Sequence, residues 1–356
     1  MTTLYVTEPY SVIKKDGDCL LVQIPPDEAL QREARKVRVP LIKVDQVVIM
    51  GSCSLTPQAL DSLLQQRSEI VYLSAHGQFL GRFVPAESRN SLLRLSQFRA
   101  HENPQRGLEL AKGFVLGKLN NARTLLMRAN RKMGDEEIAR TAKSMGEIMD
   151  QVRALQGEDT PPADPSKPQK GTVWGKLQGL EGSGTAGYFA FYGKLLRGDG
   201  ALTFEARNRR PPRDPVNAML SFGYTLLLSR CTAALQTVGL DPYIGFLHSS
   251  QYSKPALALD LMEEFRPVIV DSVVLTVVNN RMISAEDFEN EMGSVRLTKK
   301  ARRDFLTKFE ERMSTEVEHP VFKYKASYRR CLELQARLLS KAISGELAGY
   351  PPFLVR

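Results

Sequence analysis

Short apolar stretches separated by turn residues make up about the first 85 residues, a pattern that favours β-strands. β-branched and aromatic residues gather at 4–6, 19–22, 44–50 and 70–73. The Lys-Asp-Gly-Asp sequence at 15–18 predicts a hairpin, because Asp-Gly supplies the positive-φ positions that a tight reversal needs. The first part of the chain is therefore expected to be β-rich.

Two further local signals lie within this β-rich part. His76 and Gly77 predict a second reversal, with a strand returning over 79–83. Thr56 and Pro57 predict the start of a short helix, because proline fits the first helical turn.

The pattern changes near Ser88 to apolar residues spaced three and four apart, which is typical of helices. The segment 156–171 interrupts it with Pro, Gly and charged residues and is expected to be an exposed loop. A last helical region is expected over 301–347. The pattern as a whole predicts an α+β protein in which a β-rich part precedes a larger helical part.

Composition narrows the class of protein. The 356 residues are 42% hydrophobic, enough for a real core, and carry a formal net charge of +9, which fits a polyanionic partner. No signal peptide is evident at the start, and no apolar run reaches the ~18 residues needed to cross a bilayer. The four cysteines form no C-x-x-C pair, which argues against a zinc ribbon or a disulfide framework. We therefore expect a cytoplasmic protein with no membrane partner.

Glu181 stands in a glycine-rich segment, GLEGSGTAGYFAFYGKLL at 179–196. Each glycine weakens a helix by about 1 kcal/mol, so the small residues imply close approach of another backbone or of a ligand. Tight helix packing with an incidental surface glutamate is the alternative interpretation, and this segment alone leaves both open.

A second segment, 245–271, couples a histidine to a helix rich in carboxylates. Ser253 is expected to cap this helix and Pro267 to close it. Spacings of three and four place Asp260 beside Glu263 and Glu264, where like charges repel modestly and a nearby cation would relieve them.

His248 and these carboxylates together offer mixed nitrogen and oxygen ligands, which suit Mg²⁺ or Mn²⁺ with positions left for water and phosphate. A lone histidine is more often a satisfied core or turn residue than a ligand. The combination with carboxylates favours a metal site.

Arginines crowd a proline-rich turn between these two segments. Such charges cannot be buried unless they are paired, and guanidinium groups match phosphate oxygens in pairs of hydrogen bonds. The residues are therefore candidate DNA contacts, with a solvated loop as the alternative; they are Arg207, Arg209, Arg210 and Arg213.

Taken together, these segments resemble the family of CRISPR-associated integrases that insert new spacers (Cas one). The resemblance rests on several motifs in the family's order: the KDG hairpin, GSCSLTPQAL at 51–60, LEGSGTAGYF at 180–189, RRPPRDPVNAMLSFGY at 209–224, and GFLH followed by DLMEEFRP. It implies an N-terminal β-sandwich domain, placed at 1–86 and used for dimerisation, followed by a larger all-α catalytic domain at 87–356.

The resemblance also implies the metal ligands Glu181, His248 and Glu263, with Asp260 in a supporting or occasional ligand role. Some members of the family have Asp where Glu263 stands. The implied cofactor is Mg²⁺ or Mn²⁺.

The implied reaction is a metal-assisted transesterification, in which the 3′-hydroxyl of a captured DNA fragment attacks a phosphodiester at the end of a CRISPR repeat. Water in place of the hydroxyl would make the same site a nuclease. The implied partners are double-stranded DNA (the captured fragment and the repeat), a second copy of the chain in a homodimer, the small Cas two subunit that bridges two dimers, and in some systems a Cas four nuclease.

Two other functions fit the same residues. A structure-specific nuclease acting on branched DNA in repair would differ only in nucleophile and substrate geometry. A non-catalytic DNA-binding scaffold would bind DNA in a salt-sensitive way, without dependence on metal or on His248.

Overall fold

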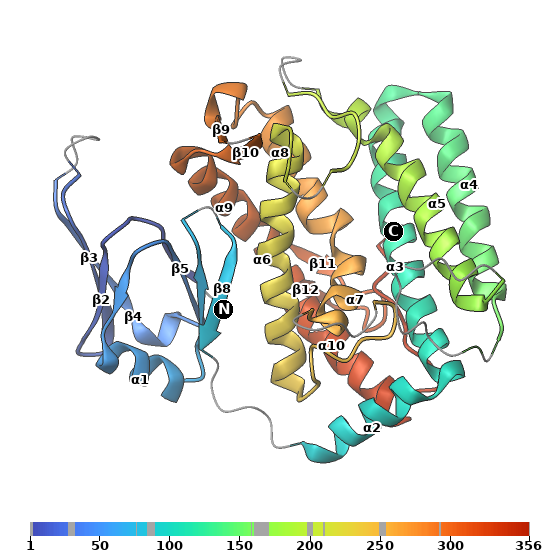
Figure 1. The fold of residues 1–356 in the computed structure, drawn as a ribbon, viewed down its shortest axis with the longest axis horizontal. Coiled ribbons are helices and arrows are strands. Elements are labelled where there is room, and N and C mark those ends of the chain that lie inside the picture. The colour runs from blue at the N-terminus through green and yellow to red at the C-terminus, as the bar shows by residue number, and fades with distance from the viewer. Residues whose placement is uncertain are drawn as a thin grey trace. The chain divides into compact units, whose positions relative to one another are not determined.

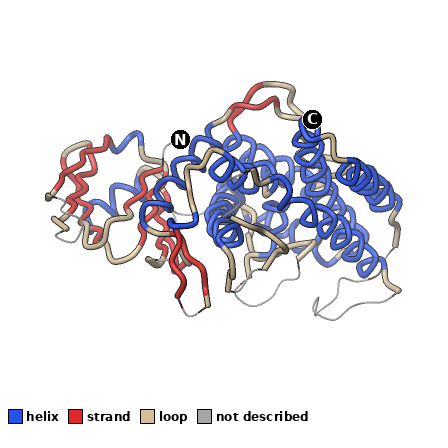
Figure 2. Tube along the Cα trace, turned by 90° about the horizontal axis from the view of Figure 1, so that it is seen from above, coloured by secondary structure: helices blue, strands red, loops and turns tan. Residues whose placement is uncertain are grey.

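The computed structural model describes residues 3–27, 33–75, 77–83, 90–157, 159, 171–197, 202–208, 211–248, 254–291 and 293–355 (Figure 1). The chain divides into two compact units, Met1–Ser88 and Arg89–Arg356. Figure 2 shows strands concentrated in the first unit and helices in the second. The α+β class expected from the sequence is confirmed.

The N-terminal unit contains two four-stranded sheets and one α-helix. Its elements are β1 (Thr3–Val6), β2 (Val12–Asp16), β3 (Cys19–Ile24), β4 (Arg35–Pro40), the 3₁₀ turn η1 (Leu41–Lys43), β5 (Gln46–Met50), β6 (Ser54–Leu55), α1 (Pro57–Gln65), β7 (Glu69–Leu73) and β8 (Phe79–Phe83). One sheet has the strand order β1-β5-β7-β8 and the other β4-β3-β2-β6. Alternate residues of both sheets point into one core, where Ile13 and Ile49 are fully buried.

The local signals of this unit are confirmed. In the predicted hairpin, β2 pairs with β3 so that Asp16 faces Cys19, and Gly17 takes a positive φ of 59°. Strands β7 and β8 pair antiparallel about the predicted second reversal, of which His76 lies outside the described residues. Helix α1 starts with Pro57 in its first turn.

The C-terminal unit is helical, as expected, and carries two short hairpins in addition. Its elements are α2 (Ser91–Glu102), α3 (Pro104–Met133), α4 (Glu136–Ala154), α5 (Val173–Tyr192), η2 (Gly193–Leu195), α6 (Pro215–Val238), α7 (Ala256–Phe265), the π-helical turn η3 (Pro267–Asp271), α8 (Ser272–Asn279), η4 (Ala285–Asp287), β9 (Phe288–Glu291), β10 (Ser294–Leu297), α9 (Lys299–Ser314), β11 (Glu316–Glu318), β12 (Lys325–Ser327) and α10 (Tyr328–Ser344). The β11–β12 hairpin divides the region 301–347, which the sequence pattern predicts as helical throughout. Most of the predicted loop at 156–171 lies outside the described residues.

Helix α6 is the only described helix that is long and apolar enough to cross a membrane by length and composition. Of its most apolar window, 67% is buried inside the protein, as in a core helix. Asp214 caps its start by accepting a hydrogen bond from the backbone N–H of Asn217, and Gly239 ends it in the left-handed conformation. The cytoplasmic location of the chain stays a prediction.

Glycines allow α5 and α7 to approach α3 closely. A Cβ atom at Gly117 of α3 would lie 2.6 Å from Cγ of Glu264 on α7, and one at Gly184 of α5 would lie 2.5 Å from Cδ2 of Leu119 on α3. A Cβ at Gly182 would meet nothing within 4 Å. The expectation that the glycines of α5 serve close packing therefore holds at Gly184 and does not extend to Gly182.

Helix α7 ends at Phe265, shortly before Pro267 as predicted, but the chain remains helical beyond it, which the sequence does not predict. Helix α7 passes through η3 into α8, and the N–H of Asp271 donates to the carbonyl of Arg266 at 3.1 Å, five residues back. Proline lacks an N–H and its ring crowds the preceding turn, so the backbone widens by one residue there instead of breaking. The predicted cap Ser253 lies outside the described residues.

The C-terminal segment lies against α7 through a buried carboxylate. Glu264 accepts hydrogen bonds from the hydroxyl of Tyr350, the backbone N–H of Phe353 and the amide of Gln335. Asn121 of α3 joins the same contact by donating to the carbonyls of Glu264 and Phe353 at 2.7 and 2.8 Å. Burial, opposed by the three bonds that Glu264 accepts, raises the pKa of its carboxyl to about 8.

Replacing Gly184 with valine should destabilise the protein by about 1–3 kcal/mol, because the added carbons must displace the buried side chain of Leu119. Gly182→Ala in the same helix should stabilise it by up to about 1 kcal/mol, because alanine favours the helix and meets open space. Chemical unfolding of both variants measures the difference. Equal effects of the two would contradict the packing described for α5.

Glu264 should make the protein less stable as pH rises. The folded state keeps the carboxyl proton up to about pH 8, whereas an unfolded glutamate loses it near its ordinary pKa of about 4.3. The contribution of Glu264 to the free energy of unfolding is complete below the unfolded pKa. It is lost as pH rises through the folded pKa, at up to about 1.4 kcal/mol per pH unit.

Glu264→Gln should flatten the dependence of unfolding free energy on pH between about 5 and 8, because an amide does not titrate. Glu147→Gln on the exposed face of α4 serves as the control and should keep the wild-type slope. A wild-type slope in Glu264→Gln would show that this carboxyl titrates elsewhere.

Candidate metal centre

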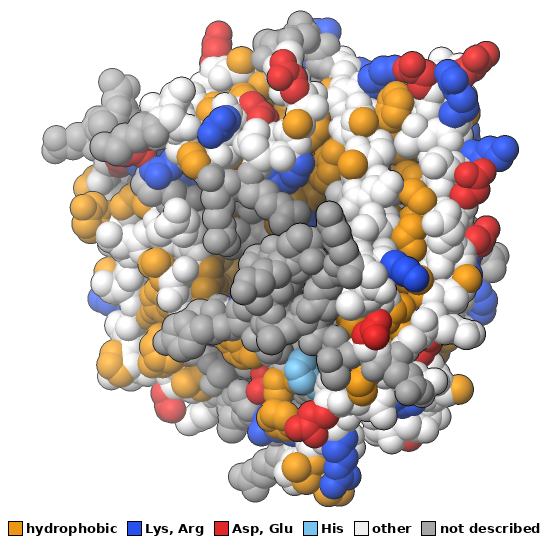
Figure 3. Space-filling view, turned by 45° about the vertical axis from the view of Figure 1, so that its right-hand side comes forward, with side chains coloured by type: hydrophobic (Ala, Val, Ile, Leu, Met, Phe, Trp, Pro, Cys, Tyr) orange, Lys and Arg blue, Asp and Glu red, His pale blue; other side chains and the backbone are white. Residues whose placement is uncertain are grey.

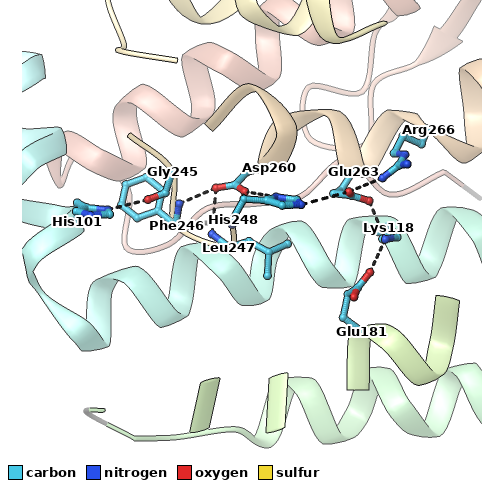
Figure 4. Close-up of polar contacts among 10 residues, drawn as sticks. All are labelled: His101, Lys118, Glu181, Gly245, Phe246, Leu247, His248, Asp260, Glu263 and Arg266. Carbon is cyan, nitrogen blue, oxygen red and sulfur yellow. Dashed lines mark hydrogen bonds and ion pairs between the residues drawn. The ribbon is translucent and has the colours of Figure 1, made fainter. Parts of the chain in front are cut away.

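His248 is held by a buried carboxylate of α7. Its Nδ1 lies 2.8 Å from Oδ1 of Asp260, whose side chain is fully buried (Figure 4). Because an ionised carboxylate only accepts, Nδ1 must donate, which leaves the Nε2 lone pair of a neutral ring free. Glu263 lies one turn after Asp260 in α7, and its Oε1 is 3.9 Å from Nε2 of His248.

Asp260 also shapes the loop that carries His248. It accepts backbone hydrogen bonds from Phe246 at 2.6 Å, Leu247 at 3.0 Å and His248 at 2.8 Å. Gly245 is required before them, because a Cβ there would lie 2.9 Å from the Asp260 carboxylate and 2.7 Å from Ala256. Asp260 therefore supports the histidine, which is one of the two roles expected for it.

Helix α2 holds the same loop from its other side. Nδ1 of His101 lies 2.7 Å from the carbonyl oxygen of Gly245, and the amide of Gln97 donates to the carbonyls of Asp241 and Ile244 at 2.8 and 2.9 Å. The loop before His248 is thus fixed through its backbone.

Two cations hold the carboxylate of Glu263, whose side chain is only 4% exposed. Nη1 of Arg266 contacts Oε1 at 2.5 Å, and Nζ of Lys118 on α3 lies 2.8 Å from Oε2. Burial alone would raise the pKa of Glu263, but Arg266 and Lys118, with a smaller contribution from His248, hold it well below its usual range. Glu263 is therefore a stable anion at any pH near neutral.

Glu181 of α5 completes the group. Its Oε1 contacts the same Lys118 ammonium and accepts a hydrogen bond from the hydroxyl of Thr185 at 3.0 Å. Figure 4 shows Glu181 and Glu263 on opposite sides of Lys118, with His248 on the far side of Glu263. The structure thus brings the three expected ligands together from one loop and two helices.

The donor set fits a hard divalent cation. Oε2 of Glu263 is buried and has no hydrogen bond of good geometry, although Nζ of Lys118 lies 2.8 Å away. Carboxylate oxygens with one imidazole nitrogen suit Mg²⁺ or Mn²⁺. As the side chains stand, however, no three His, Cys, Asp or Glu residues of the described chain are close enough to hold a metal ion. Lys118 lies between two of them.

A small pocket opens beside the Lys118 ammonium. Its lining includes Thr185, Tyr188, Tyr224 and Asp271 as well as Lys118. The hydroxyls of Tyr188 and Tyr224 donate to Asp271 at 2.8 and 2.6 Å, and burial raises the pKa of this aspartate to about 6. The wall of the pocket is therefore mainly apolar and aromatic with a few polar groups, and its carboxylate already accepts two hydrogen bonds.

The candidate DNA-binding arginines lie in different settings. Arg207 is half-buried and turned inward, where it donates to Oδ1 of Asn217 at 2.5 Å and to the Ser221 hydroxyl at 3.1 Å. Arg213 is exposed, and Arg209 and Arg210 lie outside the described residues. On the face in Figure 3, basic side chains are interspersed with acidic ones. A DNA-contacting role for these four residues stays a prediction.

Sequence reasoning missed Lys118 and Arg266, the two cations of the site. Arg266 stands within the DLMEEFRP motif, where nothing in the residue pattern alone gives it a role. Lys118 had a usable signal, because a lone lysine after Gly117 in the otherwise apolar run 114–119 must be buried and therefore paired. His101 and Gln97 gave no such signal, since they act on backbone carbonyls far away in sequence.

The chain is similar over most of its length to known proteins. The family described as "CRISPR associated protein Cas1" matches residues 4–311. CRISPR-associated endonuclease Cas1 3 of Thermus thermophilus is 39% identical over 99% of this chain and 97% of its own length. A CRISPR-associated exonuclease Cas4/endonuclease Cas1 fusion of Geobacter sulfurreducens is 41% identical over 99% of this chain, which spans only 60% of the fusion.

Solved structures share the fold at lower sequence identity. A casposase bound to its integration product has a TM-score of 0.83 at 22% identity, covering 100% of this chain and 95% of its own. A Cas1 protein from Thermotoga maritima has a TM-score of 0.76 at 22% identity, with both chains covered completely. The matches over nearly the full length show that the chain belongs to the Cas1 family of CRISPR-associated proteins.

Proposed function

We propose that the chain is a divalent-metal-dependent DNA endonuclease and integrase of CRISPR adaptation, which inserts captured DNA fragments as new spacers. The grouping of Glu181 and Glu263 about the Lys118 ammonium, with Nε2 of His248 3.9 Å from Oε1 of Glu263, carries this proposal. The Thermus thermophilus relative is named an endonuclease, and the casposase structure is titled as bound to an integration product. These names support phosphodiester chemistry on DNA.

The proposed ligands of Mg²⁺ or Mn²⁺ are Glu181, His248 and Glu263. When bound, such an ion supplies Lewis-acid stabilisation of charge on the reacting phosphate. The chain's own residues prepare the site for it: Asp260 fixes the ring and tautomer of His248, and Arg266 fixes the carboxylate of Glu263. These contacts hold the ligands in place, which limits the reorganisation required when substrate binds.

In the proposed reaction, the 3′-hydroxyl oxygen of the captured fragment forms a bond to a repeat phosphorus. The bond from that phosphorus to the 3′-oxygen of the neighbouring nucleotide breaks, and this oxygen takes up a proton as the new strand end. With water as nucleophile, the same exchange hydrolyses the strand.

We also propose partners from the relatives' names. The Geobacter sulfurreducens relative is a fusion of Cas4 with Cas1, and a structure with a TM-score of 0.74 and 24% identity is titled a Cas6-RT-Cas1–Cas2 complex. A Cas2 subunit that bridges two homodimers and a Cas4 nuclease are thus the proposed protein partners, and double-stranded DNA is the proposed substrate. The net charge of +9 fits that polyanion.

His248→Ala should reduce strand joining by about 100-fold or more. Loss of a residue that only hydrogen-bonds to a metal ligand already lowers metal affinity or activity by about 10- to 100-fold, and loss of a ligand itself should cost at least as much. The assay uses fluorescent DNA ends, a repeat-containing target and the small partner subunit, with Mn²⁺ or with EDTA. Joined product that persists in EDTA or in the variant would contradict the proposed centre. Shortened strands without joined product would instead favour the nuclease.

Asp260→Asn should lower Mn²⁺ affinity by about 10- to 100-fold, because an amide cannot accept all the backbone and ring donors that the carboxylate accepts. Asp150→Asn, on an exposed position of α4, is the matched control and should bind Mn²⁺ like wild type. Calorimetric titration measures both. Unchanged affinity in Asp260→Asn would remove this aspartate from the support of the centre.

A further inference from the structure

We propose that Lys118 is a positioning residue that stands in for the divalent cation: its ammonium holds Glu181 and Glu263 in the metal-free protein and leaves them when the ion binds. This inference rests on the proposed function, because it concerns the same site.

The ammonium occupies the position where the two proposed carboxylate ligands meet. Nζ of Lys118 contacts Oε1 of Glu181 and lies 2.8 Å from Oε2 of Glu263. The side chains of Lys118 and Glu263 are 11% and 4% exposed, so the contact is shielded from water and strong. A cation bound by both carboxylates would need these same oxygen atoms.

The charges of the site nearly balance without a metal ion. The carboxylates of Glu181 and Glu263 face two cations, Lys118 and Arg266, and the Asp260 carboxylate, which accepts from backbone and ring donors, leaves one net negative charge. A divalent ion added to this arrangement would leave an excess of positive charge in a buried place, which is costly. Metal binding is therefore favourable only when one resident cation withdraws.

Lys118 is the cation that can withdraw. Arg266 is packed 4.1 Å over the ring of Tyr224 and pairs with Glu263, three residues earlier in the chain. Lys118 reaches across from α3 on a flexible stem, and its side chain lines the pocket beside Thr185, Tyr188 and Tyr224. The hydroxyl oxygens of Thr185 and Tyr188 there can accept hydrogen bonds from an ammonium that has left Glu181.

A purely structural ion pair makes the opposite prediction. If Lys118 only braced α5 against α7, its removal would loosen the ligands and weaken metal binding. If it competes with the metal, its removal strengthens metal binding while it destabilises the metal-free protein. The sign of the change in Mn²⁺ affinity separates the two.

The experiment titrates Mn²⁺ into the full-length protein by calorimetry and follows thermal unfolding in EDTA. Lys118→Met should tighten Mn²⁺ binding by about fivefold or more, the usual lower range for a coupling between two sites, and should lower the melting temperature in EDTA. Lys118→Arg keeps the charge, and its guanidinium can clamp carboxylates with paired hydrogen bonds, so it should weaken Mn²⁺ binding. If only the net charge at position 118 mattered, the arginine variant would bind Mn²⁺ with the affinity of the wild type.

Lys112→Met is the matched control. Lys112 lies on the same helix, is equally buried, and pairs with Glu109 at 2.8 Å and with the carbonyl of Leu155 at 2.9 Å, outside the metal centre. Its replacement should leave Mn²⁺ affinity unchanged.

The outcomes distinguish failure of this inference from failure of the proposed function. Unchanged or weaker Mn²⁺ binding by Lys118→Met, together with loss of binding in His248→Ala, would overturn the role of Lys118 and leave the metal centre standing. If His248→Ala binds Mn²⁺ as tightly as the wild type, both the role of Lys118 and the proposed metal centre are overturned.

Discussion

The structure depends on how the largely buried helix α7 accommodates its carboxyl groups. Asp260, Glu263 and Glu264 of α7 are each at most 3% exposed, and an unpaired buried charge is strongly unfavourable. Each is accommodated differently: Asp260 accepts from backbone N–H groups and an imidazole, Glu263 pairs with two cations, and Glu264 keeps its proton up to about pH 8 among neutral donors. The loop before His248, helix α3 and the C-terminal segment are all fixed to α7 by these partners.

Close approach of helices makes this arrangement possible. Gly117 lets α7 contact α3 at Glu264, and the next residue, Lys118, extends toward Glu181 and Glu263. Gly245 similarly lets the loop backbone reach Asp260. A side chain at either glycine would push a carboxylate away from its partners, so packing and electrostatics constrain the same positions.

The sequence is informative where function lies within one contiguous segment. His248, Asp260 and Glu263 fall between 245 and 271, and their residue types and spacing raise the hypothesis of a metal site. The π turn at Pro267 is not predictable in this way, because proline normally ends a helix and only the surrounding packing carries α7 into α8. The role of Lys118 is hidden in the sequence because its partners lie 63 and 145 positions away in the chain.

The paired charges also explain why folding of the helical unit need not wait for a metal ion. In structural metal sites the ion supplies the folding free energy, and the ligands repel each other without it. Here Lys118 and Arg266 already neutralise Glu181 and Glu263, and Asp260 orients His248 through contacts that involve no ion. On the proposal above, an incoming divalent ion would exchange for a resident charge, and the negative phosphates of DNA would favour that exchange by offsetting the added positive charge. Metal and DNA are thus expected to bind this centre cooperatively.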